Sequence, residues 1–80
     1  MDRNTIFAKV KEYLLMQLPV DEGKITEDAR MVEDLGADSA NLMMLIMDLE
    51  GEYNMTVEDD ALTSIKTVGD IVNYIEANVG

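Results

Sequence analysis

The sequence predicts an all-α fold: a small antiparallel-type bundle of three main helices plus one short helix, with a long loop between helices one and two. Three observations support this prediction. Apolar residues recur three or four positions apart in three separate segments, as they do along the buried side of an amphipathic helix. No segment alternates apolar and polar residues as a half-buried strand does. The 80 residues suffice for a single domain over 1–80 with a thin core.

The first helix is expected to end at Pro19, because proline lacks an N–H to donate and its ring clashes with the preceding turn. Its predicted buried stripe comprises Ile6, Val10, Leu14 and Leu18, widened by Phe7 and Leu15.

A segment without any sustained period follows, over residues 20–38. A connection of that length in a compact domain is expected to be a structured, functional loop. Apolar residues at irregular spacing would anchor it across the helices, namely Val20, Ile25, Val32 and Leu35.

The second helix starts at Asp38 or Ser39, since both are good N-cap residues. Its inward stripe is predicted as Leu42, Leu45, Ile46, Leu49 and Tyr53. Residues 57–62 allow a short helical turn. The last helix has Thr67 as its N-cap and Asp70 three residues later, an arrangement similar to a capping box. Its buried stripe is predicted as Val68, Ile71, Val72 and Ile75.

The composition argues against an enzyme. The chain has no cysteine and no histidine, so it lacks thiol nucleophiles, the common zinc ligands and the usual general base. An EF-hand starting at Asp21 fails, because Gly23 and Ile25 fill its third and fifth positions and Thr26 fills the sixth, where glycine belongs. We therefore expect no dedicated metal site. An acidic, Met-rich helical sensor that binds target helices remains an alternative, supported by composition alone.

The charge is concentrated in the second part of the chain. Residues 1–30 carry six acids and five bases, whereas residues 31–80 carry eleven acids and one base, Lys66. Such a surface repels nucleic acid and anionic lipid and favours basic patches on other proteins. Mutual repulsion should also raise the average carboxyl pKa in the folded state, which would lower stability from pH 5 to pH 8.

No stretch approaches the roughly 18–20 apolar residues that a membrane span needs. The first residues, "MDRNTIFAKVKEY", contain acids and no apolar signal core. We therefore expect a cytoplasmic, unprocessed monomer with no membrane partner.

Ser39 is the best candidate for chemistry in this chain. Gly36 allows a free turn just before it, so the serine can be presented to a partner rather than packed. A helix N-terminus also offers unpaired N–H groups and a partial positive charge, which suit an attached phosphate.

The segment "VEDLGADS" (32–39) resembles the prosthetic-group attachment segment of acyl carrier proteins. The segments "TIFAKVKEYLLMQL", "LIMDLEGEY" and "IKTVGDIVNYI" follow the order and spacing of that family, so the resemblance covers nearly the whole chain. It implies that a phosphopantetheinyl transferase joins a 4′-phosphopantetheine arm from coenzyme A to Ser39 through a phosphodiester. The arm's thiol would hold acyl groups as thioesters in fatty-acid, lipid or polyketide-type biosynthesis.

The same resemblance implies which residues meet partners and cargo. Asp38 and Glu50 match recognition positions of the family, which acyl-transfer and condensing enzymes with basic docking patches would meet. Ala40, Asn41, Met44 and Met47 do not match, but we expect partners to contact them too. Met44 and Met47 would form an outward apolar patch, the alternative being that both lean into the small core. The acyl chain would contact Leu42, Leu45, Ile46, Ile65 and Ile71.

Three positions depart from the pattern of the family, which has leucine at 40, an acid at 41 and often an acid at 44. These departures predict specialisation away from general fatty-acid synthesis. They leave two alternatives open: a carrier-fold interaction module with Ser39 unmodified, and an aminoacyl or peptidyl carrier.

Overall fold

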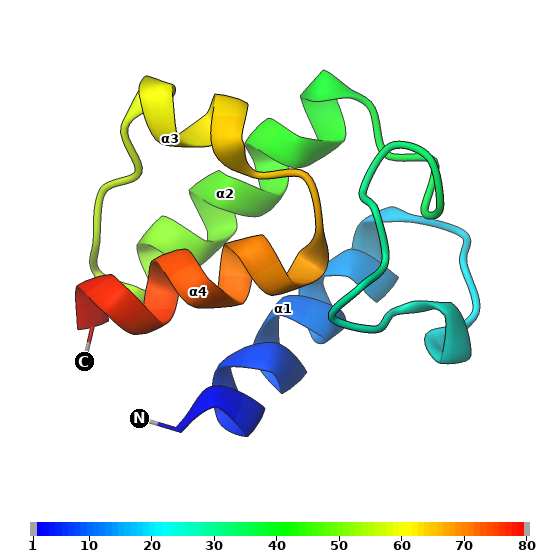
Figure 1. Cartoon of the computed structure of the whole chain (residues 1–80), viewed down its shortest axis with the longest axis horizontal. Helices are drawn as coiled ribbons and strands as arrows, with labels where there is room; N and C mark the ends of the chain where they lie inside the picture. The colour runs from blue at the N-terminus through cyan, green and yellow to red at the C-terminus, as the bar shows by residue number, and fades with distance from the viewer. Residues whose placement is uncertain (1, 80) are drawn as a thin grey trace.

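Four α-helices and one short 3-10 helix make up this computed structural model, which describes residues 2–79 (Figure 1). They are α1 (Arg3–Gln17), η1 (Glu22–Lys24), α2 (Ser39–Tyr53), α3 (Asp59–Ser64) and α4 (Val68–Val79). Helix α1 packs against both α4 and α2. Over residues 2–79 the only β-type pairing is an isolated antiparallel bridge between Arg30 and Thr67. The predicted all-α fold is therefore confirmed.

Helix α1 begins after Asp2, whose side chain accepts a hydrogen bond from the Thr5 N–H at 2.8 Å. This bond lowers the pKa of Asp2, because it favours the charged carboxylate. The predicted stripe is buried at Ile6, Val10, Leu14 and Leu18.

The predicted widening of that stripe is only half right. Phe7 is half-buried and packs against the core, but Leu15 is 39 % exposed. Successive helical residues are rotated by about 100°, so a neighbour of the buried Leu14 turns away from the core.

The loop between α1 and α2 is anchored as predicted at Ile25 and Leu35, which are buried, and at Val20, which packs against the core. The prediction is wrong at Val32, which is 62 % exposed, because the buried residue is its neighbour Met31. The Met31 N–H donates to the Lys66 carbonyl at 2.9 Å, and this pairing accompanies the inward placement of residue 31. The sequence could not reveal a bond between such distant segments.

Two further backbone bonds tie this loop to the start of α4. The Val68 N–H donates to the Ala29 carbonyl at 3.0 Å, and the Gly69 N–H donates to the Glu27 carbonyl at 2.8 Å. A Cβ at residue 69 would lie 2.9 Å from the same Glu27 oxygen. Only glycine permits this approach without a backbone shift.

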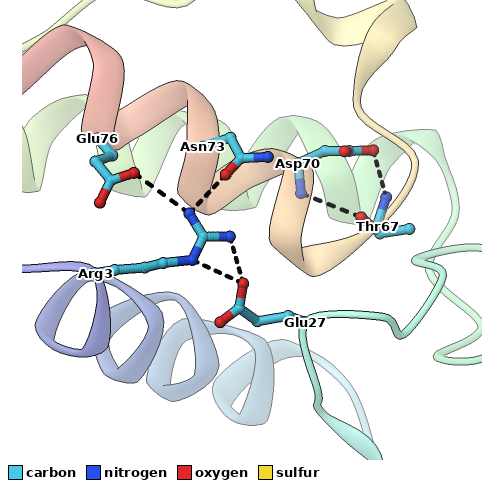
Figure 2. Close-up of polar contacts among 6 residues, drawn as sticks. All are labelled: Arg3, Glu27, Thr67, Asp70, Asn73 and Glu76. Atoms are coloured by element: carbon cyan, nitrogen blue, oxygen red, sulfur yellow. Dashed lines mark hydrogen bonds and ion pairs between the residues drawn. The ribbon is translucent and has the colours of Figure 1, made fainter.

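Helix α3 begins and ends two residues later than the predicted 57–62. The capping arrangement before α4 is confirmed: the Asp70 N–H donates to Thr67 Oγ1, and the Thr67 N–H donates to Asp70 Oδ2, both at 3.1 Å (Figure 2). The Lys66 N–H also donates to Asp70 Oδ2, at 3.0 Å. The Lys66 N–H and then the Thr67 N–H, which donate to the Asp70 carboxylate, lower its pKa because they stabilise the charged form.

Arg3 connects three parts of the chain, as Figure 2 shows. Its Nε donates to Glu27 in the loop at 2.9 Å, and its Nη1 donates to Asn73 on α4 at 2.6 Å. It also forms ion pairs with Glu27 and with Glu76. The side chain thereby holds α1, the loop and α4 at one corner of the bundle. No helix in the described part of the chain is long and apolar enough to cross a membrane.

Candidate functional site

Ser39 is the first residue of α2, and the cap of this helix is Asp38. The Asn41 N–H donates to Asp38 Oδ1 at 2.9 Å, while the Asp38 N–H donates to Asn41 Oδ1 at 3.2 Å. This reciprocal capping box leaves the Ser39 side chain free of a capping role. Ser39 is exposed, and its hydroxyl makes no hydrogen bond to any other residue between 2 and 79. Its oxygen is therefore available to a modifying enzyme.

The turn that presents Ser39 is held from both sides. Gly36 has a φ of 71°, a left-handed backbone that side chains rarely adopt. Before it, the Arg30 N–H donates to Asp34 Oδ2 at 2.8 Å, which lowers the pKa of Asp34. After it, the Ala37 N–H donates to the Met31 carbonyl at 2.9 Å. The conformational freedom of glycine thus allows Gly36 to adopt this left-handed backbone, and the bonds on both sides hold the turn in place.

The start of α2 suits an attached phosphate. The first N–H groups of a helix have no intrahelical partner, and the Asp38 side chain satisfies only that of Asn41. The N–H groups of Ser39 and Ala40 therefore lie at the positive end of the helix dipole, next to the serine oxygen. This donor set fits the phosphodiester that joins a phosphopantetheine arm to serine.

A pocket of about 420 Å³ opens beside Ser39. Its apolar wall includes Met31, Val32, Leu42 and Ile65. Leu42 and Ile65 are two of the five residues predicted to contact an acyl chain. The other three, Leu45, Ile46 and Ile71, are buried in the core and do not line this pocket.

The residues predicted for partner recognition have two kinds of environment. Ala40, Met44 and Met47 lie at helical spacing on one outward side of α2. Met44 is 55 % exposed and Met47 is 64 % exposed. Neither methionine therefore leans into the core.

Three other predicted recognition residues also have bonds within the molecule. Asp38 and Asn41 form the capping box of α2. Glu50 is half-buried, and its Oε2 accepts a hydrogen bond from the Val57 N–H at 2.7 Å, which holds the segment between α2 and α3. Glu50 thus has a structural contact in addition to any role in recognition.

Sequence reasoning missed two basic residues in the wall of the pocket, Arg30 and Lys66. The sequence does single out Lys66 in one respect, because it is the one base in residues 31–80. What the sequence could not show is that the connection before α4 returns to the start of α2. Met43 is also exposed, at 51 %, but it lies on a neighbouring side of α2 and outside this pocket. No cluster of three or more potential metal-binding side chains occurs among residues 2–79.

Comparisons with known proteins point to one family. The family model described as "Phosphopantetheine attachment site" matches residues 8–75. The "Acyl carrier protein" of Thermotoga maritima is 50 % identical over 78 residues, which cover 98 % of this chain and 96 % of that protein. The "Acyl carrier protein" of Exiguobacterium sibiricum is 43 % identical over 79 residues, or 99 % of this chain and 100 % of that protein.

The fold is similar to a solved structure of the acyl carrier protein from Enterococcus faecalis, with a TM-score of 0.82 and 29 % identity. The match covers 98 % of this chain and 99 % of that one. The chain therefore belongs to the acyl carrier protein family, whose members carry acyl groups on a covalently attached 4′-phosphopantetheine and are not themselves enzymes.

Proposed function

We propose that Ser39 is the residue that carries the 4′-phosphopantetheine arm. One observation at the start of α2 supports this proposal. Asp38 caps the helix, and the adjacent Ser39 remains exposed. A phosphopantetheinyl transferase would join the arm from coenzyme A to Ser39 Oγ through a phosphodiester. The arm supplies the thiol for thioester formation, so the absence of cysteine from the chain is no obstacle.

The protein's own residues would position this arm and shelter part of its cargo. The N–H groups at the start of α2 favour the phosphate. Leu42 and Ile65 offer an apolar wall next to Ser39. Leu45, Ile46 and Ile71 are buried in the core and do not line the pocket, so an acyl chain would contact them only if the helices moved apart.

We further propose that Ala40, Met44 and Met47 form an apolar recognition surface, the methionine surface. Methionine adapts to different partner shapes because its side chain is unbranched and polarizable. The acids around this surface would speed the encounter with basic docking patches on transferases and condensing enzymes. A surface of this kind favours a partner specialised away from general fatty-acid synthesis.

The proposed setting is the cytoplasm, with the carrier acting as a monomer in fatty-acid, lipid or polyketide-type biosynthesis. Its individual partners would be the transferase and the enzymes that load, extend or remove the acyl group.

Loading of the purified protein tests the assignment. Incubation with coenzyme A and a broad-specificity phosphopantetheinyl transferase should add one phosphopantetheinyl mass, measured on the intact protein. Ser39→Ala should remain unmodified, whereas the matched control Ser64→Ala, at the exposed end of α3, should load like the wild type. Loading that persists in Ser39→Ala would refute the assignment. No loading with several transferases would favour an interaction module with Ser39 unmodified.

A further inference from the structure

We propose that Lys66 is the charge partner of the phosphate that links the arm to Ser39, and that it draws the first part of the arm over the adjacent pocket. The inference rests on the proposed attachment at Ser39. It assigns a positioning role to a residue in the connection between α3 and α4.

Lys66 occupies a fixed place in the wall of the pocket that Ser39 also lines. Both residues line the pocket of about 420 Å³. The backbone of Lys66 is held at both ends, because its N–H donates to Asp70 Oδ2 at 3.0 Å and its carbonyl accepts from the Met31 N–H at 2.9 Å. Only the side chain is left to move.

The ammonium group of Lys66 is also available. It forms no ion pair with any other residue of the described chain, 2–79. The second base of the pocket, Arg30, is already paired with Asp34 at 3.3 Å and Glu33 at 3.6 Å. Within residues 2–79, Lys66 is therefore the one basic residue of the pocket that forms no ion pair.

The carboxylates near Lys66 form no ion pair with its ammonium group within residues 2–79. Asp70 is held instead by the Lys66 backbone N–H, which donates to its Oδ2 at 3.0 Å. Asp38 and Glu33 also line the pocket, but neither forms an ion pair with Lys66.

Attachment of the arm adds a negative charge that a nearby cation would stabilise. The phosphodiester adds a negative charge next to Asp38, on a chain whose formal net charge is already −11. The helix dipole offers only about half an elementary charge in return. A mobile ammonium in the wall of the same pocket can offset the remaining repulsion, and it would turn the arm toward Thr63 and Ile65, which also line that pocket, rather than into solvent.

The titration of Lys66 before and after loading provides a direct test. The protein is labelled with ¹³C at lysine Cε, and the shift of that carbon is followed with pH in low salt. Loading is verified beforehand from the intact mass. We expect the pKa of Lys66 to rise on loading by about 0.1–0.7 unit, the range for an exposed ion pair. Added sodium chloride should reduce this rise.

Lys24 provides the internal control. It is an exposed base in η1 that lies outside the Ser39 pocket and has no ion pair within 2–79, so its pKa should not respond. Lys66→Gln should load normally but lose the amide shift changes that loading causes at Thr63 and Ile65, whereas Lys24→Gln should keep them. Equal pKa values for Lys66 before and after verified loading would overturn the inference while leaving attachment at Ser39 intact. A failure to load would instead contradict the proposed function.

Discussion

At the scale of single residues, the proposed attachment at Ser39 rests on the bonds that its neighbours form. The sequence predicted a cap at Asp38 or Ser39 and could not choose between them. The structure gives the cap to Asp38 through its paired bonds with Asn41. Asn41, which departs from the family's usual acid, can still accept the Asp38 N–H through its side-chain oxygen. The local helix start is thus preserved although the charge is lost.

The two glycines on either side of Ser39 should respond oppositely to alanine. Gly36→Ala places a side chain at a φ of 71°, where nothing crowds it but the backbone itself is strained. We expect this variant to lose about 1–2 kcal/mol of unfolding free energy. Gly51→Ala lies in α2 with open space around the new Cβ, so it should gain roughly 0.5–1 kcal/mol. Urea unfolding measures both, and equal effects of the same sign would contradict the assignment of strain to Gly36.

At the scale of secondary-structure elements, periodicity predicted the helices well because each buries one continuous side. The stripe of α4 is buried as expected at Val68, Ile71, Val72 and Ile75. Periodicity failed in the loop, where Met31 rather than Val32 is buried. Residues in that loop face inward or outward according to backbone bonds with residues 66–69. No local pattern encodes such bonds.

The junction between this loop and α4 should be sensitive at Gly69. A Cβ there would meet the Glu27 carbonyl oxygen at 2.9 Å, and both groups are backbone and cannot rotate away. We expect Gly69→Ala to cost about 1–3 kcal/mol, as overpacking does, and to speed amide exchange at Met31 and Val68. Gly23→Ala is the matched control because a Cβ meets nothing there. If amide exchange at Met31 and Val68 were unchanged in Gly69→Ala, the backbone at this junction would have to shift without loss of its hydrogen bonds.

The outward side of α2 should set the rate of loading. We expect slow modification by a transferase from general fatty-acid synthesis, because residues 40, 41 and 44 depart from the pattern of the family. The triple variant Ala40→Leu, Asn41→Asp, Met44→Glu should load about tenfold faster. A tenfold change corresponds to roughly 1.4 kcal/mol of binding free energy toward the transferase. Burial of one leucine side chain against the transferase can supply that amount.

The control for this variant places an acid on a neighbouring side of α2. Met43→Glu changes an exposed methionine of the same helix and should load at the wild-type rate. A wild type that already loads as fast as a general fatty-acid carrier would remove the support for specialisation.

At the scale of the whole molecule, hydrogen bonds to three aspartates act against the pKa rise that the charge imbalance predicts. Three aspartates have a displaced pKa, and in each it is lowered: Asp2, Asp34 and Asp70. The chief cause is the same in all three, a backbone N–H that donates to the carboxylate. Local capping bonds therefore outweigh the repulsion expected from distant acids at these positions.

The sign of this shift fixes the pH dependence of stability. A carboxyl whose folded pKa is lowered stabilises the fold above its unfolded pKa of about 3.9, and this contribution is lost as the pH falls through the folded value. Between pH 5 and 8 the three aspartates are charged in both states, so their contribution is constant. The contribution of these three aspartates therefore predicts a melting temperature that changes little from pH 8 to pH 5 and drops below about pH 4.

Salt should act separately from this titration, because a net charge of −11 opposes compaction at any pH where the acids are ionised. Sodium chloride at pH 7 should raise the melting temperature by screening that repulsion. Magnesium is compared at equal ionic strength, so that any stabilisation beyond screening is measured separately. Thermal unfolding from pH 3 to 8 with both salts measures these effects together. A melting temperature that climbs steadily from pH 8 to pH 5 would show that repulsion, and not the capping bonds, governs how this acidic bundle responds to protons.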